Sequence, residues 1–224
     1  MGTDCMEFDF AASNLVGGAY AEEQDRASMY IAPFLPTPQE VVDRMLALAE
    51  VSQGDLLYDL GSGDGRIVIT AARRYGAKAV GFEIDPALVT HSDCNIQETG
   101  LEDLAEIREQ DIRTADLSPA SVVTIYLCPG ANLRLRAAIL RQLKPASRVA
   151  SHDFPMGNWK ADRVEQMTDS AGFLRTDLFL AHWRSVITRI GLLTLDFRMA
   201  AGVGQGEYNL SEIVIRFGGS DLVF

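Results

Sequence analysis

A glycine-rich turn between a strand and a helix stands at Tyr58-Asp59-Leu60-Gly61-Ser62-Gly63-Asp64-Gly65-Arg66. The apolar run that leads into it, residues 55–60, is typical of a buried strand, and residues 67–75 predict a helix that ends at Gly76. A glycine turn alone is equally consistent with a tight connection. Flanked by this strand and helix, it indicates the ligand-binding turn of an α/β fold.

The two acidic side chains of this turn favour a cationic ligand. A phosphate-binding turn offers bare backbone N–H groups to an anion, and a dinucleotide fingerprint needs a small residue where this chain has Arg66. S-adenosylmethionine carries a sulfonium and an ammonium, and two unit charges about 4 Å apart interact by roughly 4 kcal/mol at an effective dielectric near 20. The turn therefore predicts S-adenosylmethionine as cofactor, with Asp59, Gly61, Gly63 and Asp64 among its binding residues.

Two more acids follow the next strands along the chain. Glu83 lies near the end of a predicted strand over residues 79–84, about twenty residues past the glycines, where a doubly wound fold places a carboxylate on ribose hydroxyls. Asp111 follows a weaker strand at residues 105–109, and we expect it beside the adenine. A solvated loop acid is an almost equally good interpretation of Asp111.

Strands and helices alternate from Asp55 onward, which predicts right-handed crossovers and a parallel sheet. The fold class is therefore α/β: a Rossmann-like, doubly wound, mostly parallel seven-stranded sheet with helices on both faces and extra C-terminal β strands. The later predicted elements are a helix from Asp85-Pro86 to Gly100, a strand at 122–127, a helix at 132–143, a strand at 148–154, a helix through 164–171 capped by Gly172, and strands at 176–183, 192–199 and 207–217 with a hairpin turn at 202–206.

The chain is expected to have three parts. Residues 1–28 show no clear periodicity and predict a mobile N-terminal arm, residues 29–183 form the cofactor-binding domain, and residues 184–224 form a strand-rich extension. The domain opens on a helix, for which Thr37 is the expected N-cap, Pro38 the first helical residue and Glu40 the partner in a capping box.

Composition limits the classes of partner. The formal net charge of -11 over 224 residues disfavours nucleic acid, because binding to phosphates rests on clustered Lys and Arg. The acidic balance indicates either an ordinary soluble surface or a field that steers a Lys- or Arg-rich substrate. No apolar run approaches the roughly 20 residues of a membrane helix, and no secretory signal is visible. Cys5, Cys94 and Cys128 are scattered and form no zinc pattern, which predicts a cytoplasmic protein without a metal; the oligomeric state stays open.

Three motifs together resemble a known family. The segments Pro33-Phe34-Leu35-Pro36-Thr37-Pro38-Gln39-Glu40-Val41-Val42, Tyr58 to Arg66 and Ser151-His152-Asp153-Phe154 are similar to those of class I, seven-stranded S-adenosylmethionine-dependent methyltransferases. Within that class they resemble the archaeal broad-specificity protein-lysine methyltransferase and the ATP-synthase c-subunit lysine methyltransferases. The resemblance implies that Thr37 and its loop close over the cofactor, that Asp59, Gly61 and Gly63 cradle its methionine part, and that Glu83 and Asp111 hold ribose and adenine.

The resemblance also implies transfer of a methyl group to protein lysine side chains. A small-molecule methyltransferase, and a protein that binds S-adenosylmethionine without turnover, are the alternatives. A lysine amine with a pKa near 10.4 must lose its proton, at a cost of roughly 4 to 5 kcal/mol at pH 7, and burial beside the positive sulfur lowers that pKa. A general base is therefore not strictly needed.

If a base or a contact to the acceptor assists, Tyr126, His152 and Asp153 are the candidates, because they lie at the ends of the fourth and fifth predicted strands, at the carboxyl edge of the sheet. Tyr126 is equally consistent with core packing, and His152 with a structural hydrogen bond. Arg66 is expected to pair with Asp59 or Asp64 and hold the turn.

Overall fold

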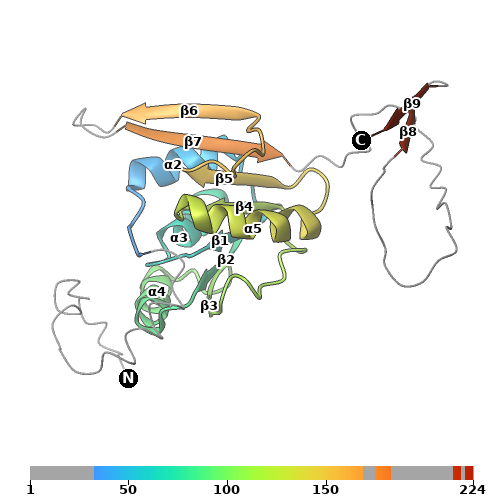
Figure 1. The fold of residues 1–224 in the computed structure, drawn as a ribbon. Coiled ribbons are helices and arrows are strands. Elements are labelled where there is room, and N and C mark those ends of the chain that lie inside the picture. Colours follow the sequence, from blue (N-terminus) through green and yellow to red (C-terminus); the bar gives the residue numbers. More distant parts are fainter. Residues whose placement is uncertain (1–32, 169–174, 183–213, 218–219, 224) are drawn as a thin grey trace, which may run out of the picture. The chain divides into compact units, whose positions relative to one another are not determined.

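A seven-stranded mixed sheet dominates the computed structural model, which describes residues 33–168, 175–182, 214–217 and 220–223 (Figure 1). The strand order is β3-β2-β1-β4-β5-β7-β6. The first five of these pair in parallel, whereas β7 runs antiparallel to both β5 and β6. The strands are β1 (Leu56–Leu60), β2 (Lys78–Glu83), β3 (Ala105–Glu109), β4 (Val122–Ile125), β5 (Arg148–His152), β6 (Arg163–Thr168) and β7 (Arg175–His182). The predicted Rossmann-like, mostly parallel sheet is confirmed.

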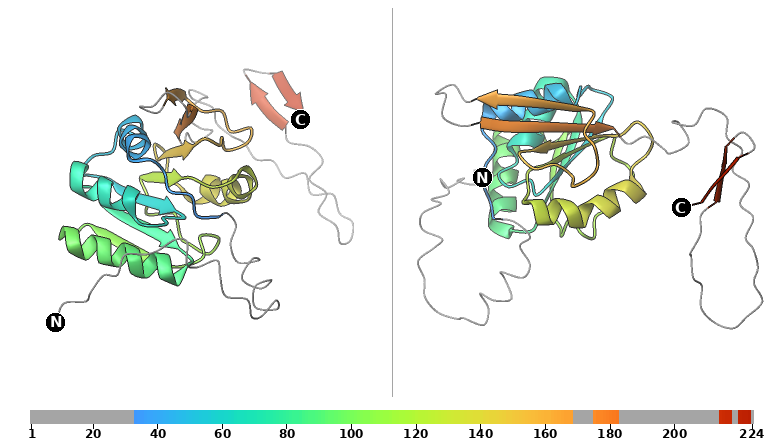
Figure 2. Two further views of the ribbon diagram at one scale, coloured as in Figure 1. Left: turned by 90° about the vertical axis from the view of Figure 1, so that its left-hand side faces the viewer. Right: turned by 45° about the horizontal axis from the view of Figure 1, so that its top comes forward.

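Helices cover both faces of this sheet (Figure 2). The helices are α2 (Gln39–Leu48), α3 (Arg66–Tyr75), α4 (Pro86–Thr99) and α5 (Pro129–Gln142). Side chains of β1 alternate between the two layers, as strand geometry requires. Leu57 joins the apolar cluster that holds residues of α2, α3 and α4, while Tyr58 and Leu60 join the cluster that holds residues of α5.

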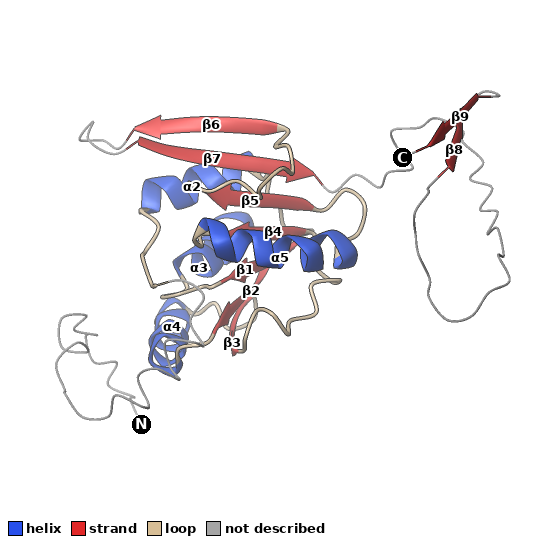
Figure 3. Cartoon of the chain, in the orientation of Figure 1, coloured by secondary structure: helices blue, strands red, loops and turns tan. Residues whose placement is uncertain are grey.

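The chain divides into two units, Met1–Trp183 and Arg184–Phe224. The sheet and the four helices belong to the first. In the second, β8 (Val214–Phe217) pairs antiparallel with β9 (Ser220–Val223), as the secondary-structure view in Figure 3 shows. β8 falls inside the strand predicted at 207–217, and β9 was not predicted. The predicted arm at 1–28, the capping Gly172, the strand at 192–199 and the turn at 202–206 lie outside the described residues.

The helix predicted at 164–171 is wrong, because residues 163–168 form the edge strand β6. Val164 and Met167 suit a helical spacing, but a run this short fits either period. Val164 is 52% exposed, so the apolar side chain that suggested a buried helical face lies mostly in solvent. The main-chain pairing of β6 with β7 determines the local structure here.

The predicted N-cap of α2 is also wrong. Pro38 occupies that position, and its carbonyl accepts hydrogen bonds from the N–H groups of Val41 and Val42 at 2.9 and 3.0 Å. No side chain caps the helix. The hydroxyl of Thr37 lies 3.3 Å from Nδ1 of His152, a residue far along the chain, and so serves the site rather than the helix.

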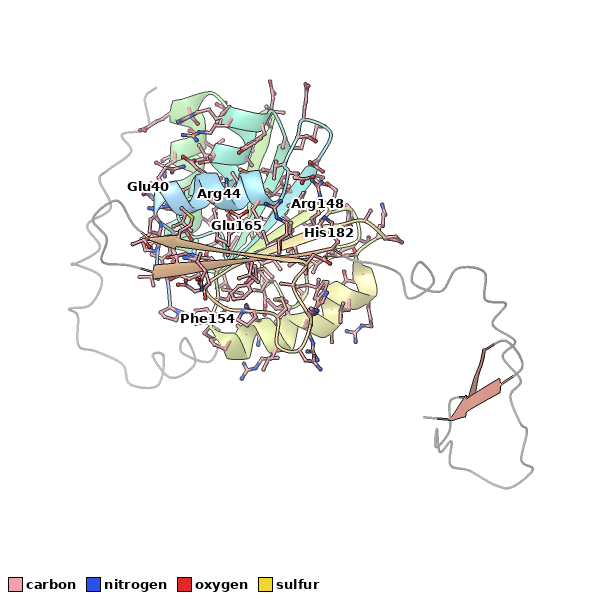
Figure 4. All side chains as sticks on the ribbon, turned by 90° about the horizontal axis from the view of Figure 1, so that it is seen from above. Glu40, Arg44, Arg148, Phe154, Glu165 and His182 are labelled. Atoms are coloured by element: carbon pink, nitrogen blue, oxygen red, sulfur yellow. The ribbon has the colours of Figure 1, made fainter. Side chains whose placement is uncertain are left out.

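The amino end of the sheet is held by a buried ion pair. Arg148, at the start of β5 and labelled in Figure 4, pairs with Asp55, which directly precedes β1. Its Nη1 also donates to the carbonyls of Ala49 and Glu50, both at 2.8 Å. Arg148 therefore ties the end of α2 to the start of two strands.

Both edge strands of the sheet display charged side chains. In β3, Arg108 pairs with Glu106 at 2.8 Å. In β6, Arg163 pairs with Glu165 at 2.7 Å, and Arg44 of α2 meets the same carboxylate at 2.5 Å (Figure 4). The sheet thus ends on each side in a strand that carries an ion pair.

Candidate active site

The glycine turn after β1 takes a backbone path that L side chains rarely adopt. Gly61 and Gly63 have φ angles of +80° and +55°. The N–H groups of Gly61 and Ser62 donate to the carbonyl of Phe82 at 2.9 and 3.1 Å, which ties the turn to β2. A β-carbon at Gly63 would overlap the ring of Phe34. Glycine at position 63 therefore meets two demands, the positive φ and the close approach of Phe34.

A pocket opens beside this turn at the carboxyl ends of β1, β2 and β4, where open α/β sheets bind ligands. Its empty volume is about 930 Å³, part of it open to solvent. All seven residues predicted to bind the cofactor line this pocket: Thr37, Asp59, Gly61, Gly63, Asp64, Glu83 and Asp111. One cavity therefore collects residues that are spread over more than seventy positions of the sequence.

Asp59 is a buried carboxylate with one oxygen left over. Its Oδ1 accepts a hydrogen bond of 2.7 Å from the hydroxyl of Thr124, while Oδ2 is buried and has no hydrogen-bond partner among the described residues. Burial raises the pKa of Asp59 to about 7; the nearby charges of Glu83 and Asp64 add to this, and the bond from Thr124 opposes it. An unpaired buried carboxylate oxygen is costly unless a ligand cation completes it, so the pocket fits the ammonium group of S-adenosylmethionine.

Glu83 holds the turn from the end of β2. Its Oε2 accepts the N–H of Gly63 at 2.9 Å, and its Oε1 accepts those of Ile84 and Asp85 at 2.7 and 3.0 Å. A carboxylate has about four acceptor sites, so Glu83 keeps capacity for a ligand hydroxyl. Sequence reasoning gave Glu83 only a ligand role, whereas the structure adds this backbone role.

Arg66 pairs with Asp64, one of the two partners expected for it. Its Nε lies 2.9 and 3.0 Å from the two oxygens of Asp64, and its Nη1 donates to the carbonyl of Thr37 at 2.8 Å. Arg66 thus joins the glycine turn to the segment that precedes α2. Asp111 pairs similarly with Arg113 at 2.5 Å; the hydrogen bonds from Arg113 outweigh burial and lower the pKa of Asp111.

The three candidates for the acceptor side lie together. Tyr126 lines the pocket, and the buried ring of His152 stacks on it with centroids 3.8 Å apart and an interplanar angle of 29°. Nε2 of His152 is 3.6 Å from Oδ2 of Asp153, and its Nδ1 meets Thr37. His152 and Asp153 are not among the pocket-lining residues. The ring of His152 therefore contacts two lining residues, Thr37 and Tyr126, and lies near Asp153.

Burial sets the titration of this cluster. It lowers the pKa of His152, against the opposing charge of Asp153, so the imidazole is neutral near pH 7. It raises the pKa of Tyr126, and the charge of Asp153 adds to that shift. Asp153 itself has a φ of +58°, a conformation that Asp tolerates better than most residues.

Sequence reasoning missed part of the pocket wall. Phe34 and Leu35 line it from the segment before α2, and Ser62 and Leu127 line it from loops after β1 and β4. The apolar, proline-bounded run Pro33-Phe34-Leu35-Pro36 next to Thr37 was the available signal for the first two. The buried hydroxyl of Ser62 has no hydrogen-bond partner among the described residues, and no sequence pattern marked it.

The described ranges lack two other kinds of feature. They contain no group of three or more His, Cys, Asp or Glu side chains placed to hold a metal ion. No helix within them has the length and apolar character needed to cross a bilayer. Within the same ranges, neither Cys94 nor Cys128 forms a disulfide.

Comparisons with known proteins agree with this site. A sequence model of the ANTKMT methyltransferase domain matches residues 59–163. A protein-lysine N-methyltransferase of Saccharolobus islandicus is 42% identical over 138 residues, which cover 61% of this chain and 86% of that protein. The human ATP synthase c-subunit lysine N-methyltransferase is 31% identical over 69% of each chain. A Salinibacter ruber protein described as an RNA methyltransferase, crystallised with S-adenosyl-L-homocysteine, is 50% identical over 67% of this chain and 94% of its own, with a TM-score of 0.63.

The sheet order and the acidic glycine turn define a class I methyltransferase that uses S-adenosylmethionine. The chain belongs to the family of protein-lysine N-methyltransferases that contains the archaeal enzyme and the enzymes that act on the ATP synthase c-subunit.

Proposed function

We propose that this protein transfers a methyl group from S-adenosylmethionine to the ε-amino group of a lysine in a protein. The observation that carries the proposal is the single pocket that unites the buried, half-paired Asp59 with Tyr126, next to the Tyr126–His152–Asp153 cluster. The carboxylate of Asp59 suits the cationic methyl donor, and the polar cluster at Tyr126 suits an amine acceptor.

Different residues of the pocket bind different parts of the cofactor. Asp59 takes the ammonium of the methionine part, Glu83 the ribose hydroxyls and Asp111 the adenine amine, while Gly61, Gly63 and Asp64 shape the turn and Thr37 covers it. When bound, S-adenosylmethionine supplies a methyl carbon whose bond to sulfur breaks as the amine nitrogen bonds to it, the sulfur keeping the electron pair. The protein therefore needs mainly to position the two partners and to obtain a neutral amine.

The acceptor side prepares that amine. The negative charge of Asp153 favours the approach of the lysine as an ammonium, and the amine then loses its proton to water because burial beside the positive sulfur lowers its pKa. The hydroxyl of Tyr126 contacts the amine. His152, which burial keeps neutral, acts as a positioning residue, since its ring fixes that of Tyr126 by stacking and is itself held by Thr37.

The Salinibacter protein motivates a second candidate, methyl transfer to RNA. The net charge of -11 makes it the less favoured of the two. A third possibility, a small-molecule acceptor, has no observation of its own in the site. A cytoplasmic location stays a prediction, based on the scattered cysteines of the sequence.

The test is a labelling experiment with the full chain. Purified protein is incubated with methyl-labelled S-adenosylmethionine and, in parallel, with a protein extract, total RNA and a metabolite fraction. We expect label on methyl-lysine, identified by mass spectrometry of tryptic peptides. Label confined to RNA or metabolites contradicts the lysine acceptor, and tight cofactor binding without any transfer contradicts catalysis.

A further inference from the structure

Helix α5 is a basic element in an acidic protein. Its sequence, Pro129–Gln142, contains three arginines and no Asp or Glu, whereas the whole chain has a net charge of -11. Arg134 and Arg141 are exposed, and they are seven residues apart, so they lie on one face of the helix about 10 Å from each other. Two charges of one sign are therefore held side by side in solvent.

Among the residues that the structure describes, the arginines of α5 differ from most others because no carboxylate pairs with them. Seven arginines in the described ranges form ion pairs with Asp or Glu: Arg44, Arg66, Arg74, Arg108, Arg113, Arg148 and Arg163. None of the recorded ion pairs within those ranges involves Arg134, Arg136 or Arg141. Of these three, Arg136 instead donates to Asn158. The positive charge of α5 is thus concentrated and not neutralised locally.

The helix is also attached to the acceptor side of the site. It begins three positions after Tyr126, and Asn132 in its first turn donates to the carbonyl of Phe154 at 2.9 Å. Phe154 follows Asp153 directly, and Figure 4 places it beside α5. A polypeptide whose lysine reaches the Tyr126 cluster can therefore continue along α5.

The outward face combines the charges with apolar surface. Leu133 is 52% exposed next to Arg134, and Ala137 is exposed between the two arginines. A mixed arginine and apolar surface is typical of protein interfaces, in which Arg is enriched. A solvated face of a helix in an acidic protein would more readily carry acids.

We propose that the outer face of α5, formed by Leu133, Arg134, Ala137 and Arg141, docks an acidic segment of the acceptor protein. The inference rests on the proposed function, and it narrows the substrate to proteins in which acids accompany the target lysine. Two outward arginines neutralise few of the phosphates of a nucleic acid but match the one or two carboxylates of a short acidic segment, so an acidic protein segment fits this face better.

The helix also sets the spacing in the acceptor. At 1.5 Å per residue, Arg134 lies about 7 Å and Arg141 about 18 Å along the axis from the start of α5. An extended peptide advances about 3.3 Å per residue. The acids are therefore expected about two to six residues from the target lysine.

The experiment compares two fluorescent peptides that share one lysine. One carries glutamates at that spacing, and the other has glutamine at each of those positions. Binding to the full chain is measured by anisotropy, and methylation by the KM and kcat for each peptide. We expect the glutamate peptide to bind about tenfold more tightly, with the difference in KM rather than kcat, and the preference to fade at high salt.

The decisive variant is R134E/R141E, which should abolish the preference while leaving cofactor affinity unchanged. R73E is the control for negative charge added elsewhere, because Arg73 is exposed on α3, distant in sequence from Tyr126 and Asp153, and has no recorded ion pair within the described ranges. R73E should keep the preference. Equal preference in R134E/R141E and wild type overturns the proposal, as does an oligoribonucleotide that competes with the peptide in wild type but not in R134E/R141E.

The binding assay also separates the two ideas. If the glutamate peptide binds through Arg134 and Arg141 but is never methylated, the docking surface stands and the lysine acceptor fails. If lysine peptides are methylated without regard to their acids, the proposed function stands and the docking surface fails.

Discussion

One acid directly precedes strand β1 and another lies near its carboxyl end, and the two have opposite surroundings. Asp55, at the amino end, accepts hydrogen bonds from Ser52 and Ser121 and pairs with Arg148. Although burial raises it, these hydrogen bonds and the charge of Arg148 together hold the pKa of Asp55 below its ordinary value. Asp59, at the carboxyl end, has one hydrogen bond to Thr124, a free buried oxygen and a pKa raised to about 7.

The difference separates a carboxylate that stabilises the fold from one that waits for a ligand. Asp55 has its full set of partners within the protein, so it contributes to stability. Asp59 has no cationic partner among the described residues, so its charge destabilises the folded chain until a cation binds. Three perturbations test this contrast, and a fourth tests the contact between Thr37 and His152.

The largest expected effect is on stability at the amino end. Arg148→Ala leaves Asp55 as a buried charge without its partner, and we expect the free energy of unfolding to fall by about 3 to 5 kcal/mol. The matched control is Arg44→Ala, which removes an exposed ion pair to Glu165 and should cost less than about 1 kcal/mol. Urea denaturation measures both. Equal losses would show that the Asp55 network is no more important than a surface pair.

The second largest expected effect is on the binding of S-adenosylmethionine at Asp59, near the carboxyl end of β1. Asp59→Asn keeps an acceptor for Thr124 but removes the charge that faces the ammonium, and we expect the affinity for S-adenosylmethionine to fall about 100-fold, or roughly 2.7 kcal/mol. Calorimetry measures the affinity. Stability should not fall at pH 8, because the variant has no buried charge. A variant that binds normally, or that unfolds more readily, contradicts the role given to Asp59.

The pH dependence of binding should be smaller. The pKa of Asp59 in the free protein is about 7, and an unfolded aspartate titrates near 3.8. Because the folded pKa is the higher one, the contribution of Asp59 to stability is present below pH 3.8 and is lost as the pH rises through about 7. The ammonium of S-adenosylmethionine binds only to the charged form of Asp59. The affinity should therefore weaken about tenfold from pH 8 to pH 6, and binding at pH 6 should release a proton from Asp59.

Calorimetry in buffers of different ionisation enthalpy detects that proton, with Asp59→Asn as the control that releases none. The same pH slope in both proteins would assign the titration to another group.

The smallest expected effect concerns Thr37. Thr37→Val preserves the shape of the side chain but removes the hydroxyl that meets Nδ1 of His152. We expect kcat to fall about fivefold, the equivalent of one hydrogen bond of about 1 kcal/mol. Thr37→Ser should restore it. A change confined to cofactor affinity would show that Thr37 does not act through His152.

Local patterns predicted much of the fold and the donor side of the site. The glycine turn, Asp59 and Glu83 lie within one strand, one helix and the next strand, and their chemistry is visible in sequence order. The helix predicted at 164–171 failed because an exposed edge strand buries too few side chains to show its period.

Long-range contacts could not be predicted. Thr37 reaches His152 across 115 positions, and Asp55 reaches Arg148 across 93. Nothing local distinguishes a hydroxyl that caps a helix from one that meets a distant imidazole. The same limit hid the opposite surroundings of Asp55 and Asp59, because sequence alone shows two similar acids on one strand.

The ion pairs on β3 and β6 bear on behaviour at high concentration. An exposed strand edge is a template on which another molecule can add a strand and begin a fibre. Here an incoming strand would lie beside Arg108 and Glu106 on β3, or beside Arg163 and Glu165 on β6. Pairing there would desolvate these charged side chains, which is unfavourable. Replacing those side chains with valine or threonine would therefore remove a barrier to the addition of a strand at either border.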